Sequence, residues 1–129
     1  MPEFFNPPTV AAPSSSYSHG VIVSANAKRL IVSGQVGVKP DGTVAKGMKA
    51  QTEQAIDNLF NVVTGAGMKV TDIVKIVTYV TNPANIADMR EVRAAKFGSH
   101  APASTLLIIA GLANPEFLIE IEAEAIQDS

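Results

Sequence analysis

Three glutamates alternate with apolar residues near the end of the chain. Glu120, Glu122 and Glu124 lie on one side of a run in which every second residue is apolar, and this period of two is typical of a strand with one buried face. The three carboxylates are then about 7 Å apart along the strand. One interpretation is a solvated face, because like charges at this spacing normally need water. The other is that a second subunit covers the face, raises the pKa of one glutamate and makes it a proton carrier.

Two arginines form a second group of polar residues. Arg90 and Arg93 recur with Ile86 and Phe97 at spacings that place all four on one helix face. One interpretation is that both guanidinium groups lie at the edge of the apolar stripe and reach water. The other is an anion site, because a guanidinium matches the geometry of a carboxylate or a phosphate. No glycine-rich phosphate loop accompanies them, which favours a small carboxylate over a nucleotide.

Several other chemistries are excluded or unsupported. The chain has no cysteine, which excludes disulfides, thiolate nucleophiles and cysteine-based metal sites. Its two histidines, His19 and His100, are interpreted as loop or surface residues, so we expect no metal site and no cofactor. Tyr17 and Ser33 offer hydroxyl groups, although a lone tyrosine or serine is usually structural. The spacing of the residues supports no Ser-His-Asp arrangement.

Length and charge limit the class of protein. The 129 residues predict one domain, 1–129, that is large enough to bury a core. The net charge is −2 and the basic residues are scattered, so we expect no nucleic-acid partner. No apolar run is long enough to cross a bilayer, and the first residues lack the features of a signal peptide. We therefore expect a cytoplasmic protein with no membrane partner.

The periodicity of the chain predicts an α+β fold. In chain order, the expected elements are strands at 21–23 and 29–33, a helix at 47–66, a strand at 73–81, a helix at 84–97, and strands at 103–109 and 117–126. This β-β-α-β-α-β-β order indicates one mixed sheet packed with two helices. We expect the first two strands and the last two strands to form hairpins, and the continuously apolar strand at 103–109 to be covered on both faces.

Glycines mark several expected boundaries. Gly67 is placed to end the first helix, and Gly98 to end the second. Gly34 follows a strand, which predicts a bulge or a close approach by another backbone. Residues 6–19 contain three prolines and a serine run, and they predict an irregular lead-in.

Short motifs that cover nearly the whole chain resemble one family. They are Tyr17-Ser18, Val32-Ser33-Gly34-Gln35, Gln51 through Asn58-Leu59, Ala66-Gly67, Asp72-Ile73-Val74-Lys75, Pro102-Ala103 and Ile119-Glu120-Ile121-Glu122-Ala123. In combination they resemble the Rid family (YjgF/YER057c/UK114). The resemblance implies a chorismate-mutase-like fold, a homotrimer and sites in the clefts between subunits. It also implies hydrolysis of reactive enamines and imines, such as 2-aminoacrylate and its imine, to 2-keto acids and ammonia.

The resemblance carries over only in part. Tyr17 matches the family tyrosine, and Glu120 matches the glutamate associated with the catalytic water. In deaminating members an arginine after Pro-Ala clamps the substrate carboxylate, but here that position is Ser104, followed by Thr105. A hydroxyl cannot supply the bidentate, charge-assisted pair. Arg90 stands where the family often has an asparagine.

The first functional hypothesis is an enzyme that hydrolyses a C–N bond in a small imine or enamine other than 2-iminopropanoate. Glu120 would orient or deprotonate water, with Tyr17 as the second catalytic residue. The expected substrate-binding residues are Ser104, Thr105, Arg90, Ser33 and Gly34. Arg90 would replace the missing arginine as the clamp for an anionic substrate.

Two alternatives remain. The second hypothesis is a trimeric binding or regulatory protein that holds a carboxylated metabolite in the same pocket without turnover. The third is ribonuclease activity, a label that this family sometimes carries. The acidic balance and the absence of basic clusters argue against the third.

Overall fold

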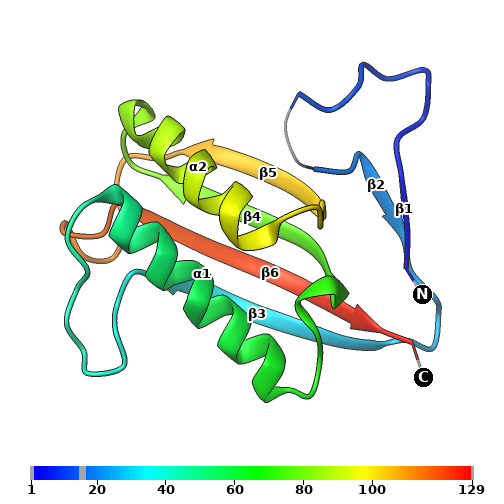
Figure 1. The fold of residues 1–129 in the computed structure, drawn as a ribbon, viewed down its shortest axis with the longest axis horizontal. Coiled ribbons are helices and arrows are strands. Elements are labelled where there is room, and N and C mark those ends of the chain that lie inside the picture. Colours follow the sequence, from blue (N-terminus) through cyan, green and yellow to red (C-terminus); the bar gives the residue numbers. More distant parts are fainter. Residues whose placement is uncertain (1, 15–16, 129) are drawn as a thin grey trace.

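A computed structural model describes residues 2–14 and 17–128. One mixed, four-stranded sheet packs against two helices, and a separate two-stranded ribbon lies beside it (Figure 1). The elements in chain order are β1 (Glu3–Phe5), β2 (Gly20–Ile22), β3 (Lys28–Val36), α1 (Met48–Gly65), the 3₁₀ helix η1 (Val70–Asp72), β4 (Ile73–Val80), the 3₁₀ helix η2 (Pro83–Asn85), α2 (Ile86–Phe97), β5 (Ala103–Ile108) and β6 (Ile119–Gln127). The predicted α+β class is confirmed. No helix in the described ranges is both long and apolar enough to cross a membrane.

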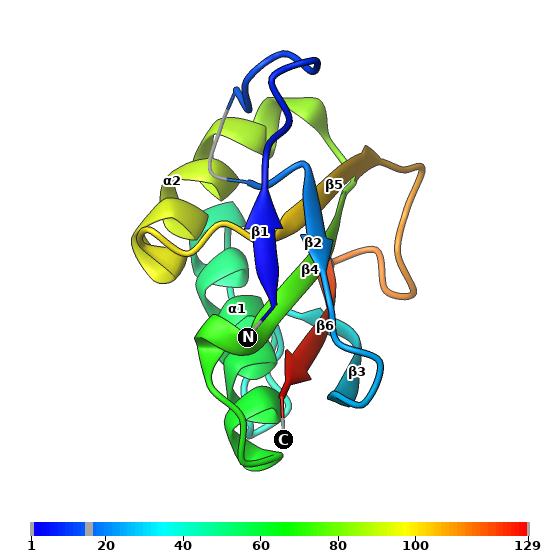
Figure 2. The same ribbon diagram turned by 90° about the vertical axis from the view of Figure 1, so that its right-hand side faces the viewer.

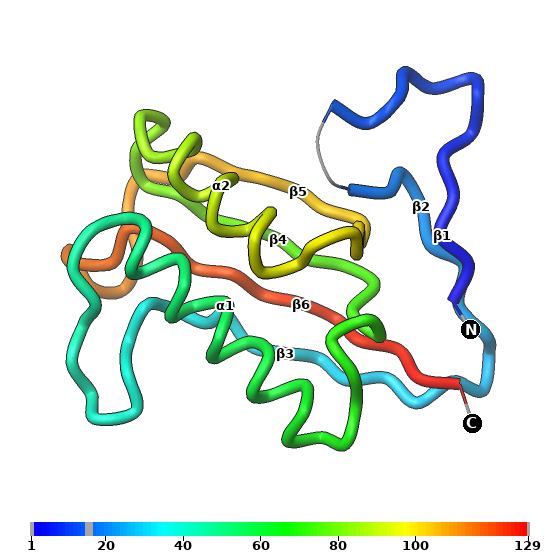
Figure 3. The backbone as a smooth tube through the Cα atoms, viewed as in Figure 1, coloured from blue at the N-terminus to red at the C-terminus, as the bar shows by residue number. Residues whose placement is uncertain are grey.

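The strand order of the main sheet is β3-β6-β4-β5, with β4 antiparallel to β6 and parallel to β5. The predicted C-terminal hairpin is therefore wrong, because β4 lies between β5 and β6. The predicted hairpin over residues 20–33 is also wrong, since β2 pairs with β1 and β3 pairs with β6. Figure 3 shows β3 and β6 side by side although they are far apart in the sequence. Periodicity identifies a strand but does not identify its neighbour.

The N-terminal ribbon was not predicted as such. β1 pairs antiparallel with β2 (Figure 2). In the register of this pair, Phe5 lies opposite Gly20. A Cβ at Gly20 would come within 2.7 Å of the Phe5 ring, so a larger residue at this position would displace that ring. The lead-in over 6–19 is largely irregular, as predicted, and its residues 15–16 lie outside the described ranges.

Both helices lie on one side of the sheet, and the other side has no helix over it (Figure 2). The predicted alternation along β6 is confirmed, and β4 alternates in the same way. The buried side includes Ile76, Thr78, Val80, Ile119, Ile121, Ala123 and Ala125. The glutamates of β6 point to the open side and are half-buried. β5 is an edge strand with Thr105, Leu107 and Ile108 exposed, so the expectation that both its faces are covered is wrong for this chain.

Helix α1 is held to the sheet by both apolar and polar contacts. Its inner face buries Ala55, Ile56 and Leu59 completely. Gly67 follows the helix with a φ of 76°, and Gly98 follows α2 with a φ of 60°, as predicted for glycines that end helices.

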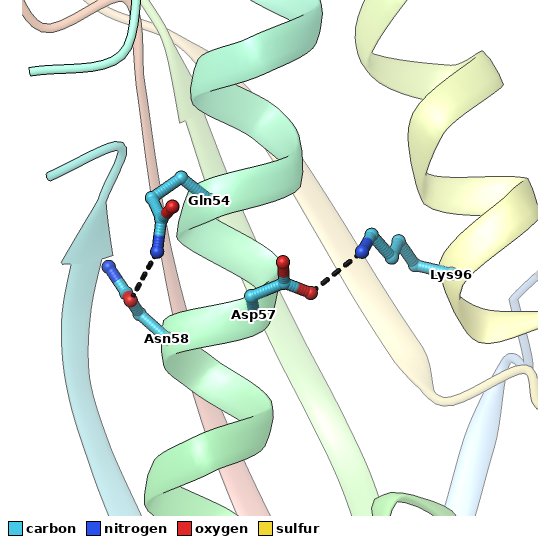
Figure 4. Close-up of polar contacts among 4 residues, drawn as sticks. All are labelled: Gln54, Asp57, Asn58 and Lys96. Carbon is cyan, nitrogen blue, oxygen red and sulfur yellow. Dashed lines mark hydrogen bonds and ion pairs between the residues drawn. The ribbon is translucent and has the colours of Figure 1, made fainter. Parts of the chain in front are cut away.

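Side-chain amides on α1 fix the neighbouring loops. Gln51 donates to the Glu116 carbonyl at 2.9 Å and accepts from the Leu118 amide at 2.8 Å, which anchors the approach to β6. Asn58 donates to the carbonyls of Val36 and Val38 at 3.0 and 2.9 Å. It also accepts from Gln54, while Lys96 of α2 pairs with Asp57 at 2.7 Å (Figure 4).

Two fully buried threonines offer a matched test of stability. Thr52 donates to the Met48 carbonyl at 2.7 Å, whereas Thr78 has no hydrogen-bond partner for its hydroxyl within the described residues. Replacing Thr78 with valine removes a desolvated, unpaired hydroxyl at nearly constant volume, so we expect the free energy of unfolding to rise by about 1 kcal/mol. Thr52→Val should lower it by about 1 kcal/mol. Urea unfolding at one protein concentration measures both changes, and the reverse order of stability would contradict the assignment.

Candidate functional site

A depression of about 210 Å³ lies where the N-terminal segment, α2 and β5 meet. Its lining residues are Ser14, Tyr17, Met89, Arg90, Arg93, Ser104 and Leu106. Three of the predicted site residues, Tyr17, Arg90 and Ser104, are therefore brought together. Arg93, the second arginine of the predicted helix face, joins them.

Ser104 reaches this depression because of its register in the sheet. It lies opposite Ile76 of β4, and Leu106 lies opposite Thr78, so both share the side of the sheet that carries the helices. Thr105 lies opposite Val77 and is exposed on the open side. The structure therefore does not place Thr105 in the depression with Ser104.

Tyr17 is positioned by the residue that follows it. Ser18 is buried; its amide donates to the Pro102 carbonyl at 3.1 Å and its hydroxyl donates to the Ala101 carbonyl at 2.5 Å. These bonds attach the N-terminal segment to the start of β5. The Tyr17 ring also meets the His19 ring edge-on, at 5.5 Å between centroids. Tyr17 is thus held beside the strand that carries Ser104.

The two arginines are one turn apart on α2 and give the depression a positive charge. Arg90 is exposed and Arg93 is half-buried. Burial, and to a lesser extent the nearby charge of Arg90, lowers the pKa of Arg93, although a guanidinium stays protonated at neutral pH. No lining residue in the described ranges is acidic. This combination of charge and hydroxyl groups can bind a small anion.

Glu120 belongs to a second group, on the open side of the sheet. Its carboxylate lies directly against Gly34, where a Cβ would collide with it. The register of β3 against β6 shifts between Val32 and Gln35, which confirms the predicted bulge. The close approach is made by a carboxylate rather than by a backbone. Ser33 lies exposed in the same bulge.

Within one chain, these two groups are well separated. Ser104 lies opposite Ile76, whereas Glu120 lies opposite Tyr79, three residues further along β4 and on the other side of the sheet. The offset is roughly 10 Å along the strand and roughly 10 Å across two strand spacings. A small ligand in the depression cannot reach Glu120 of the same chain.

The other two glutamates of β6 have partners of their own. The Tyr79 hydroxyl donates to the Glu122 carboxylate, and this bond is the main cause of the raised pKa of Tyr79. Glu124 pairs with Arg29 at 3.0 Å. The three carboxylates are therefore not equivalent, and the tyrosine and arginine contacts were not predicted.

Neither histidine contributes to a metal site. The Nε2 atom of His19 lies 2.7 Å from the Ala11 carbonyl, and that of His100 lies 2.7 Å from the Ile73 carbonyl. Residues 2–14 and 17–128 contain no group of three histidine, cysteine, aspartate or glutamate side chains that could hold a metal.

Sequence reasoning missed several residues of the depression. Leu106 could have been found, because it shares a strand face with Ser104 at a spacing of two. The anchoring role of Ser18 and the contribution of Ser14 had no signal, since both depend on where the irregular lead-in crosses β5.

Comparisons with known proteins agree with this architecture. The family model described as Endoribonuclease L-PSP matches residues 9–127. A 2-iminobutanoate/2-iminopropanoate deaminase of Salmonella typhimurium is 36% identical over 102 residues, which are 76% of this chain and 79% of the relative. A solved structure of a Rid family protein of unknown function from Yersinia pestis is 36% identical, with a TM-score of 0.84 over 96% of this chain and 97% of that chain.

A structure with a ligand is also similar. Escherichia coli TdcF with bound serine is 25% identical, with a TM-score of 0.74 over 98% of this chain and 99% of that chain. The α+β arrangement shared with these structures is the chorismate-mutase-like fold that the motifs implied. The chain belongs to the Rid family (YjgF/YER057c/UK114).

Proposed function

We propose that this protein is a homotrimer that hydrolyses the C–N bond of a small, anionic imine or enamine in clefts between subunits. The observation that carries the proposal is the division of polar residues into two groups. Tyr17, Arg90 and Ser104 meet in one depression, and Glu120 lies in the bulge of β3 on the opposite side of the sheet. A neighbouring subunit can bring the missing group to each depression.

The open side of the sheet supports assembly. Ile31 is 60% exposed and Leu107 is 44% exposed there, although both are large apolar residues on strands. They lie on the two edge strands, β3 and β5, of the face that has no helix over it, and the proposed neighbour would cover that face. A cyclic trimer would repeat the same contact around its axis, so each subunit would supply both groups to different clefts.

The proposed reaction is hydrolysis of an imine. Glu120 accepts a proton from water as the water oxygen bonds to the imine carbon. Glu120 passes this proton to the nitrogen. The proton of the new hydroxyl group then moves to the nitrogen through the same carboxylate, the C–N bond breaks, and ammonia leaves as the carbonyl forms. Arg90 holds the substrate carboxylate, while Tyr17 and Ser104 contact the substrate through their hydroxyl groups. The printed name of the Salmonella relative, a deaminase of 2-imino acids, supports this class of reaction.

A binding protein without turnover is the second candidate. Escherichia coli TdcF, a similar structure, contains bound serine, which supports a ligand of amino-acid size for this fold. The depression of about 210 Å³ is smaller than the roughly 300–1,000 Å³ of pockets for drug-sized ligands. This size supports a small metabolite rather than the RNA that the family description would imply.

Replacing Glu120 with glutamine tests the enzyme directly. The variant keeps the shape of the side chain but cannot accept the proton, so we expect hydrolysis to fall by about 10²-fold or more. Glu124→Gln, on the same face of β6, should retain most activity. An amino-acid oxidase generates the imines in the cuvette. Semicarbazide competes with the protein for the imine, and this competition reports how fast the protein removes it. Unchanged hydrolysis in the Glu120 variant would remove its proposed role, and ligand binding by a wild type that hydrolyses no imine would support the second candidate.

Mixed trimers test whether each site spans two subunits. We expect Glu120→Gln and Tyr17→Ala each to impair hydrolysis, because each lacks one group of the cleft. Unfolded together in equal amounts and then refolded, they should regain activity, since about a quarter of the clefts then combine two intact groups. Each variant refolded alone is the control. Activity that stays at the mean of the two controls, in trimers shown by mass spectrometry to contain both variants, would contradict a shared site.

A further inference from the structure

We infer that the depression selects a dianionic substrate, namely a 2-imino acid with a second, terminal carboxylate. The inference rests on the proposed function for its reaction but on the lining residues for its selectivity. Both Arg90 and Arg93 line the depression, and no acidic residue lines it in the described part of the chain. A substrate with one carboxylate would place a single negative charge against two positive ones.

The geometry of α2 keeps the two guanidinium groups on one site. Arg90 and Arg93 are three residues apart, and side chains at this spacing are neighbours on a helix surface, with Cβ atoms about 5–6 Å apart. Each guanidinium can bind a carboxylate through two parallel hydrogen bonds. The pair therefore presents two cationic groups to one ligand in the depression.

Electrostatics favours the second negative charge. Arg93 is half-buried, and its pKa is lowered by burial and by the neighbouring charge of Arg90. Burial and the Arg90 charge both disfavour the charged form of Arg93. The negative charges of a bound dianion would offset both effects. A monoanion relieves them only in part, because one of the two positive charges remains without a negative charge from the ligand.

The wall opposite the helix adds no charge of its own. The residues of β5 that line the depression are Ser104 and Leu106, so no charged side chain enters from the strand. Ser104 is short and presents a hydroxyl, which can hydrogen-bond to the imine nitrogen or to a carboxylate. Among the described lining residues, the positive charge comes from the helix side, where a terminal carboxylate can lie beside the first.

Two product-like ligands of equal length test the selectivity without any reaction. 2-Oxoglutarate and 2-oxopentanoate both have five carbons, and only the first carries a terminal carboxylate. By isothermal titration we expect 2-oxoglutarate to bind about ten- to hundredfold more tightly to the wild type. Arg90→Gln and Arg93→Gln should each reduce this preference about tenfold. Lys96→Gln removes a charge from the same helix outside the depression, and it should leave the preference unchanged.

The matching imines separate this inference from the proposed function. Oxidation of D-glutamate and of D-norvaline generates 2-iminoglutarate and 2-iminopentanoate in place. Faster hydrolysis of 2-iminoglutarate, by kcat/KM, supports both ideas.

Hydrolysis of both imines at equal rates, with equal binding of the two oxo acids, overturns the selectivity and leaves the proposed function standing. A clear preference for 2-oxoglutarate with no hydrolysis of either imine overturns the proposed function and supports the dianion site. Inorganic phosphate that displaces 2-oxoglutarate at equal affinity overturns the assignment to a dicarboxylate.

Discussion

Strand β4 fixes the arrangement on which the remaining structure depends. It is paired on both edges, antiparallel to β6 and parallel to β5, so its register determines which side of the sheet each neighbouring residue faces. Residues level with Ile76 and Thr78 turn toward the helices, and residues level with Val77 and Tyr79 turn away from them. A shift of one residue would exchange the two sides and expose the apolar core. Burial on one side therefore decides on which side of the sheet Ser104 and Glu120 lie.

This register makes the proposed chemistry a property of an assembly. Ser104 faces the helices and Glu120 faces away from them, so one chain cannot apply both to the same small molecule. Gly34 adds a local constraint, because the Glu120 carboxylate occupies the place where a side chain at position 34 would begin. The bulge of β3 thus holds the carboxylate at the surface where the proposed neighbour packs. Folding and association would together complete the site.

The sequence predicted the elements well because their periods are local. Gly67 and Gly98 follow the two helices with positive φ angles as expected, and the alternation in β6 gave its buried side correctly. Pairing was predicted poorly, since neither hairpin exists and the apolar strand β5 lies at an edge. Strand partners depend on contacts between distant residues, and an apolar strand can be apolar because a second molecule covers it. The arginine face of α2 was visible from spacing, whereas the position of Tyr17 depends on Ser18 and its bonds to β5.

The division of the polar residues also bears on how such a protein diversifies. Those that would recognise the ligand come from the N-terminal segment, α2 and β5, and the carboxylate that would activate water comes from β6 against β3. Substitutions in the first set can change ligand preference without disturbing the second. Ser104 on β5 and the two arginines on the facing helix all belong to the first set. In the proposed site, ligand preference and reactivity can therefore change independently of each other.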